Sequence, residues 1–159
     1  MKGYVIMVDK PQEPQQRSKT EWYLPHHPVI NPNKPGKVRR VLNGAAKFRG
    51  VSLNNSLPTG PDLLQKLIHV LFRFRQHEFA VSADIEGKFL QVGVLEKDQP
   101  CLRFLWREDT TKNVDVLQYT RHIFGSKDSP TCANFALQQT ARDNQNKFPE
   151  AAKAVQQKF

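Results

Sequence analysis

Two stretches of the chain alternate apolar and polar residues in the way that predicts paired β-strands. Residues 22–42 contain WYLPHHPVI and KVRRVL on either side of NPNKPG, and their prolines exclude a helix. Farther along, CLRFLWRE and VDVLQYTRHI lie on either side of a polar loop. We therefore predict two β-hairpins, the first with its tip at residues 31–37.

Apolar residues follow a helical repeat after Gly60-Pro61-Asp62, at positions 64, 67, 68, 71 and 74. The breadth of this stripe predicts a helix over residues 63–76 that packs into a core. Ser129-Pro130 is typical of a helix start, and it predicts a helix over residues 129–144. A last helix is predicted over PEAAKAVQQKF, residues 149–159.

The stretch FAVSADIEGKFLQVGV, residues 79–94, predicts a strand over 79–83, a turn at Asp84 and a second strand over 89–94. Strands and helices thus alternate without a regular βαβ repeat. The pattern predicts an α+β fold, with a mixed or antiparallel sheet and packed helices.

The chain is strongly basic, and its positive charge is concentrated in one segment. The net charge is +9 at pH 7. No Asp or Glu occurs from Trp22 to Pro61, a segment that contains Lys34, Lys37, Arg39, Arg40, Lys47 and Arg49. Such a segment attracts polyanions, with nucleic acid the first candidate and an acidic membrane surface the second. The alternative is a solvated basic face that serves only solubility.

The 159 residues suit one domain, predicted over 22–159, with residues 1–21 as a loose N-terminal arm or linker. Cys101 and Cys132 form no CxxC motif, which favours a reducing compartment and buried thiols. Because no stretch is typical of a signal peptide or a membrane span, an intracellular location is predicted.

Asp84 raises two interpretations. A carboxylate at a turn commonly accepts hydrogen bonds from backbone N–H groups two or three residues on, here those of Glu86 or Gly87. A carboxylate at the tip of a strand is also a good ligand for Mg²⁺, which prefers rigidly held oxygen atoms. The adjacent His26 and His27 would point to opposite sides of a strand, and they are not predicted to share a metal ion.

Several blocks together resemble the reverse transcriptase domain of BEL/Pao-type LTR retrotransposons. They are WYLPHHPVINPNKPGKVRRV, SLPTGPDLL, VSADIEGKFLQV, LRFLWRED, YTRHIFGSKDSPTCANFAL and PEAAKAVQQKF, and they run in the same order from Trp22 to Phe159. The resemblance implies the fingers and part of the palm of a right-hand polymerase. It also implies RNA or DNA template-primer, deoxynucleotides and the rest of a Pol polyprotein as partners, in the cytoplasm or a virus-like particle.

Site residues follow from the resemblance position by position. Asp84 matches the first catalytic aspartate, with the Ile85 carbonyl as a further ligand of Mg²⁺ in a two-metal nucleotidyl transfer. Phe89 matches the steric gate that favours deoxynucleotides, or it is a plain core aromatic. Arg39 matches the fingers arginine on the triphosphate. Either Lys34 or Lys37 could match the fingers lysine near the γ-phosphate, and we name Lys37. Gly125 matches a glycine whose backbone approaches the nucleotide.

Two departures from the family limit this interpretation. Many retroviral relatives have a Gln where this chain has Phe124. Family members also carry an aromatic-X-Asp-Asp hairpin, which by resemblance would begin just after Lys158 or Phe159. Without it the chain would hold Mg²⁺ weakly or not at all, and we predict no polymerase activity and poor solubility for this chain alone.

Two other classes of function remain open. The basic segment 34–49 alone would suit a non-catalytic nucleic-acid-binding module. The PxxP spacing of Pro25 and Pro28 would suit a polyproline ligand of another protein domain.

Overall fold

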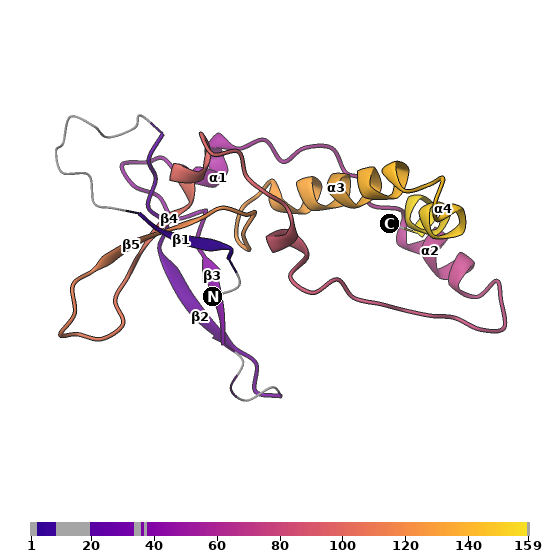
Figure 1. The fold of residues 1–159 in the computed structure, drawn as a ribbon, viewed down its shortest axis with the longest axis horizontal. Helices are drawn as coiled ribbons and strands as arrows, with labels where there is room; N and C mark the ends of the chain where they lie inside the picture. The colour runs from indigo at the N-terminus through magenta and orange to yellow at the C-terminus, as the bar shows by residue number, and fades with distance from the viewer. Residues whose placement is uncertain (1–2, 9–19, 34–35, 37, 159) are drawn as a thin grey trace.

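The computed structural model describes residues 3–8, 20–33, 36 and 38–158. The described part contains helices and antiparallel sheets, so the chain has the predicted α+β fold. Its strands gather at one end, α3 leads away from them, and α2 and α4 lie at the other end (Figure 1).

Two β-hairpins form where the alternation of apolar and polar residues predicts them. Strands β2 (His26–Ile30) and β3 (Val38–Leu42) pair with each other, with His26 opposite Leu42 and Ile30 opposite Val38. Strand β4 (Arg103–Trp106) pairs with β5 (Asp115–Tyr119) across the predicted polar loop. Both hairpins are therefore confirmed.

The N-terminal residues contribute a strand that the sequence analysis assigned to a loose arm. Strand β1 (Val5–Val8) pairs along β5 and completes a three-stranded sheet in the order β1-β5-β4. The run Val-Ile-Met-Val consists of good strand formers, and β5 offers it a free edge on which to pair. The prediction of a loose arm was wrong for these four residues.

The hydrophobic core lies where the three-stranded sheet meets the base of the β2–β3 hairpin. Phe104 is completely buried at its centre, and Leu42 and Ile123 are nearly so. The other buried members of this cluster are Leu24, Leu53, Leu102, Leu117 and Tyr119. The short helices α1 (Leu53–Ser56) and Gln99–Leu102 supply Leu53 and Leu102 to it.

The two predicted C-terminal helices are confirmed. Helix α3 (Ser129–Asp143) begins with Pro130 in its first turn, where a missing N–H costs no helical hydrogen bond. Helix α4 (Pro149–Lys158) follows and packs on α3. None of the described helices is long and apolar enough to cross a membrane.

The helix predicted over residues 63–76 is shorter and more exposed than expected. Helix α2 (Leu67–Phe74) has no buried residue, although its apolar side chains follow the predicted repeat. Leu71 is 45% exposed and Phe72 69% exposed. The prediction that this helix packs into a core was wrong, because periodicity reveals an apolar face but not whether another element covers it.

The two strands predicted around Asp84 are also absent. Residues 79–85 are irregular, with Phe79 84% exposed and Val81 90% exposed. Residues Lys88–Gln91 form a 3-10 helix in place of the second strand, and beyond it only Gly93 forms an isolated bridge, with Arg121. A strand needs a neighbouring backbone to accept and donate its hydrogen bonds, and no described segment pairs with residues 79–83.

Candidate nucleic-acid interface

The β2–β3 hairpin presents its two arginines to different surroundings. Successive residues of a strand point to opposite faces, so Arg39 and Arg40 diverge. The Arg40 guanidinium lies 4.4 Å from the ring centroid of Trp106 and 5.0 Å from that of Phe104. Arg39 is exposed on the other side of the hairpin. Arg40 is thus part of the fold, whereas Arg39 is accessible to a ligand.

His26 shares the aromatic environment of Arg40. Its ring lies 5.3 Å from Phe104 in an edge arrangement and 5.9 Å from Trp106. Burial lowers the pKa of His26 below 6.5, and the charges of Arg40 and His27 lower it further. His26 is therefore a neutral packing residue at pH 7, and it points away from the exposed His27, as adjacent strand residues do.

A tight turn after the hairpin projects another arginine. The N–H groups and carbonyls of Phe48 and Val51 exchange hydrogen bonds of 2.8 and 3.1 Å. Both residues between them have positive φ, +50° at Arg49 and +84° at Gly50, as in type I′ turns. A non-glycine residue in this region costs about 1 kcal/mol. The Arg49 guanidinium lies 5.4 Å from the centroid of the Phe48 ring.

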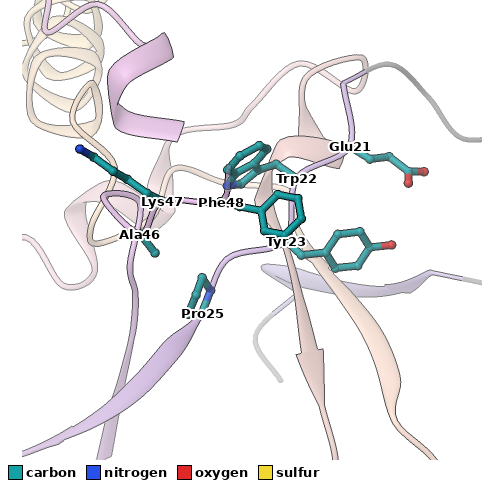
Figure 2. A pocket seen from close by; sticks show the side chains of 7 residues that line it. All are labelled: Glu21, Trp22, Tyr23, Pro25, Ala46, Lys47 and Phe48. Carbon is teal, nitrogen blue, oxygen red and sulfur yellow. The ribbon is translucent and has the colours of Figure 1, made fainter. Parts of the chain in front are cut away.

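An aromatic pocket lies at the base of the β2–β3 hairpin, beside this turn. Its volume is about 540 Å³, and it is lined by Glu21, Trp22, Tyr23, Pro25, Ala46, Lys47 and Phe48. Figure 2 shows the rings of Trp22, Tyr23 and Phe48 gathered together, while the Lys47 amine extends outward. Phe48 is 65% exposed, which leaves its ring accessible for stacking.

Positive charge around the pocket is not neutralised within the described part of the chain. No acidic side chain described in the structure forms an ion pair with Arg39, Lys47 or Arg49. Glu21, the one acid in the pocket lining, is instead paired with Arg103, with 2.5 Å between Oε1 and Nη1. The pocket therefore combines accessible rings with cations that have no acidic partner among the described residues.

Asp84 and Ile85, the predicted metal ligands, do not lie at the tip of a strand. Both are exposed in the irregular segment between α2 and the 3-10 helix Lys88–Gln91. Asp84 belongs to no cluster of three candidate metal ligands among the described residues. The described residues therefore bring no second and third candidate ligand next to Asp84.

Phe89, the predicted steric gate, lies in the 3-10 helix and is half-buried. Its ring centroid is 4.8 Å from that of Phe124, within the range of favourable aromatic pairs. The neighbouring Lys88 donates a hydrogen bond of 2.5 Å to Asn134 on α3. Phe89 is not a member of the hydrophobic core cluster, and its partner Phe124 is 43% exposed, so the pair lies at the edge of the fold. The hydrogen bond from Lys88 ties the segment after Asp84 to α3.

Gly125 makes a close backbone approach, but to its own chain. An added Cβ would lie 1.9 Å from the carbonyl oxygen of Leu42, at the end of β3. Asn54 holds the same junction, donating to the Gly125 carbonyl at 3.1 Å and accepting from the Lys127 N–H at 3.0 Å. Gly125 thus joins the loop before α3 to the basic hairpin.

Lys37, the predicted fingers lysine, lies outside the described residues, as does Lys34. Arg39 lies on β3 and the basic turn follows that strand in the chain, whereas Asp84 lies in a different, exposed segment.

Sequence reasoning missed the aromatic lining of the pocket. Trp22, Tyr23 and Phe48 come from two segments that meet only in the folded chain. One local signal was present, because Arg49-Gly50 between Phe48 and Val51 has the form of a two-residue turn flanked by strand formers. Comparison of the sequence with protein-family models and with curated proteins finds no match.

Proposed function

We propose that this chain is the fingers and part of the palm of an RNA-directed DNA polymerase of the BEL/Pao retrotransposon kind, and that its own residues hold single-stranded template. One observation carries the binding role. The exposed rings of Tyr23 and Phe48 and the partly buried ring of Trp22 line a pocket beside Lys47 and Arg49, and the surrounding segment 22–61 contains no acidic residue. The polymerase assignment itself rests on the resemblance in sequence.

The chemistry of the pocket suits unpaired bases. Every base has a flat π-face, so stacking on rings such as Phe48 needs no particular sequence, and it is worth about 1–3 kcal/mol per base. The phosphates on either side would then meet Lys47, Arg49 and, farther along the hairpin, Arg39. A duplex hides the faces of its bases, so we expect single strands to bind more tightly than duplexes of equal length.

No catalytic step through Mg²⁺ is proposed for this chain. Phosphoryl transfer by two metal ions needs several carboxylates held together, and Asp84 has no such partners among the described residues. We expect no primer extension with Mg²⁺, deoxynucleotides and a poly-A template. Product formation that disappears in Asp84→Ala would contradict this expectation and would establish a polymerase.

A salt titration of oligonucleotide binding tests the binding role. Fluorescence anisotropy of a labelled single strand would give the association constant at several salt concentrations. If the three cations each neutralise one phosphate, log K should fall with log salt with a slope of about −2. Arg39→Gln and Lys47→Gln should each reduce that slope by about 0.7. An affinity too weak to measure near physiological salt would refute the binding role.

Two variants separate the pocket from a general attraction to positive charge. Phe48→Ala should weaken binding about tenfold while leaving the salt slope unchanged, because it removes a ring and no charge. Lys112→Gln removes one exposed cation in the β4–β5 loop, where Lys112 is already paired with Glu108. It should leave the affinity nearly unchanged, and an effect as large as that of Lys47→Gln would contradict a localised interface.

The non-catalytic nucleic-acid-binding module remains the second candidate. Both candidates use the same aromatic pocket and cations, so binding measurements do not separate them. Primer extension by a chain to which an aromatic-X-Asp-Asp hairpin is joined after Phe159 would favour the polymerase. The polyproline interpretation is less well supported, because Pro28 lies within β2 opposite Arg40 and not in a free extended segment.

A further inference from the structure

A second group of reactive side chains lies on the other side of the core, where β5 leads into α3. His122 follows β5, Asp128 precedes the first residue of α3, and Cys132 lies in the first turn of that helix. One nitrogen, one oxygen and one sulfur of these residues all lie within 4.8 Å of one another. No other such group of three occurs in the part of the chain that the structure describes.

The backbone fixes both halves of this cluster. The Cys132 N–H donates to the Asp128 carbonyl at 3.0 Å, so the two side chains share one face of the helix turn. The His122 N–H donates to the Val92 carbonyl at 3.0 Å, and its neighbour Ile123 is buried in the core. The three side chains therefore meet because of the fold and not because of loop geometry alone.

Neighbouring hydroxyl groups orient the side chains of the cluster. Ser126 Oγ donates to Oδ1 of Asp128, which leaves Oδ2 facing His122 Nδ1 at 3.8 Å. The fully buried Ser129 places its Oγ 3.4 Å from the same ring nitrogen. The side chains of His122 and Asp128 are only 14% and 23% exposed. The Ser126 contact, on the carboxylate oxygen that faces away from His122, is of the kind that holds metal ligands in position in known sites. The Ser129 hydroxyl would have to turn away from His122 Nδ1 if that nitrogen bound the metal.

The cluster faces a cavity that admits a small ion. The cavity has a volume of about 350 Å³, and all three side chains contribute to its lining. Much of the remaining wall is apolar, including Leu53, Leu57 and Leu102. A divalent cation entering here would therefore find its donors concentrated at one place.

We propose that His122, Asp128 and Cys132 bind a borderline divalent transition metal, with Zn²⁺ as the best fit. Mg²⁺ and Ca²⁺ prefer oxygen ligands alone, whereas Zn²⁺ accepts imidazole, carboxylate and thiolate together. Ligand distances of about 2.0–2.3 Å in a tetrahedral site place ligand atoms roughly 3.3–3.8 Å apart. The observed spacing reaches this value with side-chain shifts of about 1 Å. The fourth position would face the cavity.

A nucleophilic Cys-His-Asp arrangement fits these residues less well. Burial raises the pKa of the Cys132 thiol, and the negative charge of Asp128 raises it further. A catalytic thiolate needs the opposite influence from its surroundings. The metal site is independent of nucleic-acid binding, since none of its ligands lines the aromatic pocket.

Titration of the full chain with Co²⁺ tests the site, because cobalt bound to a thiolate absorbs light through ligand-to-metal charge transfer. We expect a saturable band with one Co²⁺ per chain that Zn²⁺ displaces. Cys132→Ser should remove the band, and His122→Asn should weaken binding at least tenfold. Cys101→Ser is the matched control, since Cys101 lines the same cavity outside the cluster and should leave the band intact.

Alkylation of the unsubstituted chain gives a second measurement that does not depend on the folding of a variant. With Zn²⁺ present, mass spectrometry should show Cys132 protected from iodoacetamide at least tenfold relative to Cys101. The proposal would be overturned if Co²⁺ gave no charge-transfer band, if the band survived Cys132→Ser, or if Zn²⁺ protected neither thiol. A band lost in Cys101→Ser instead would also overturn it.

Discussion

Gly125 lies where the loop before α3 meets the end of β3. Its φ is +102°, and an added Cβ would collide with the backbone carbonyl of Leu42, which cannot rotate aside. We therefore expect Gly125→Ala to lower the free energy of unfolding by about 3 kcal/mol or more, as measured by urea denaturation.

Gly50 provides the matched control for this prediction. Its φ is also positive, at +84°, but an added Cβ would meet no atom within 4 Å. Gly50→Ala should therefore cost only the backbone strain, about 1 kcal/mol. Equal costs at the two positions would show that close backbone approach at Gly125 contributes nothing.

His26 makes the stability of the β2–β3 hairpin depend on pH. Its pKa in the folded chain lies below 6.5 because of burial, Arg40 and His27. Well above pH 6.5 the ring is neutral in both states. As the pH falls below 6.5, the unfolded chain takes up a proton that the folded chain resists, so the free energy of unfolding decreases until the folded-state pKa is passed.

Replacing His26 isolates this contribution from that of other titrating groups. Urea denaturation of the wild type and of His26→Asn should show a stability difference that is constant well above pH 6.5 and changes as the pH falls through 6.5. His27→Asn, at the exposed neighbouring position, should keep most of the wild-type dependence. A constant difference between wild type and His26→Asn at all pH values would contradict the prediction.

At the scale of elements, α2 is a helix that packs on no core and has no side-chain cap at its start. It spans Leu67–Phe74, has no buried residue, and has no side-chain cap at Lys66. Isolated helices this short are marginal in water. We expect Lys66→Asp to slow hydrogen exchange of the α2 amides. The new carboxylate would accept hydrogen bonds from free N–H groups at the helix start, and it would lie at the positive end of the helix dipole. Together these contacts should stabilise α2 by about 1 kcal/mol.

Lys66→Ala separates the cap from the loss of a positive charge. It removes the cation but supplies no hydrogen-bond acceptor, so exchange of the α2 amides should be slowed much less than in Lys66→Asp. If both variants exchanged alike, capping would not limit the stability of this helix.

The elements that the sequence predicted well are those whose signals are local and mutually consistent. The two hairpins combine alternation with polar turns, and α3 combines a helical repeat with Pro130 in its first turn. The strands predicted over 79–83 and 89–94 failed because their pairing partner had to come from elsewhere in the chain. Strand β1 was missed for the same reason, since Val5–Val8 pairs with β5.

The candidate sites also differ in whether their residues come from one segment or from several segments that meet only in the folded chain. Arg39 was named from the resemblance alone, because alternation along a strand shows that Arg39 and Arg40 diverge but not which of the two is exposed. The aromatic pocket joins residues 21–25 to residues 46–48, and the proposed metal site joins His122 to the start of α3. Asp128 and Cys132 have the spacing of one helical turn, which is visible in DSPTC, but the third ligand becomes evident only once β5 and α3 are folded.

At the scale of the whole molecule, the chain exposes more surface than its mass requires. Its accessible surface is 12271 Å². A compact protein of 18.3 kDa exposes roughly 8,100 Å². Leu67 and Phe72 on α2 and Phe79 and Val81 in the irregular segment beyond it are all exposed. Apolar surface of this extent favours association.

We therefore expect the purified chain to self-associate through α2. Sedimentation velocity over a range of concentrations should show species heavier than 18.3 kDa, the mass of one chain. Replacing Leu67, Leu71 and Phe74 with Glu should shift the distribution toward the monomer, because these positions share one face of the helix.

A second triple variant controls for the added negative charge. Asn33, Thr110 and Asn113 are exposed polar residues in loops, and replacing them with Glu changes the net charge by the same amount. This variant should associate as the wild type does, because it leaves the apolar face of α2 intact. A wild-type chain that sediments as a single monomer at all concentrations would contradict the prediction. A charge control that dissociates as fully as the α2 variant would attribute association to net charge and not to the apolar face.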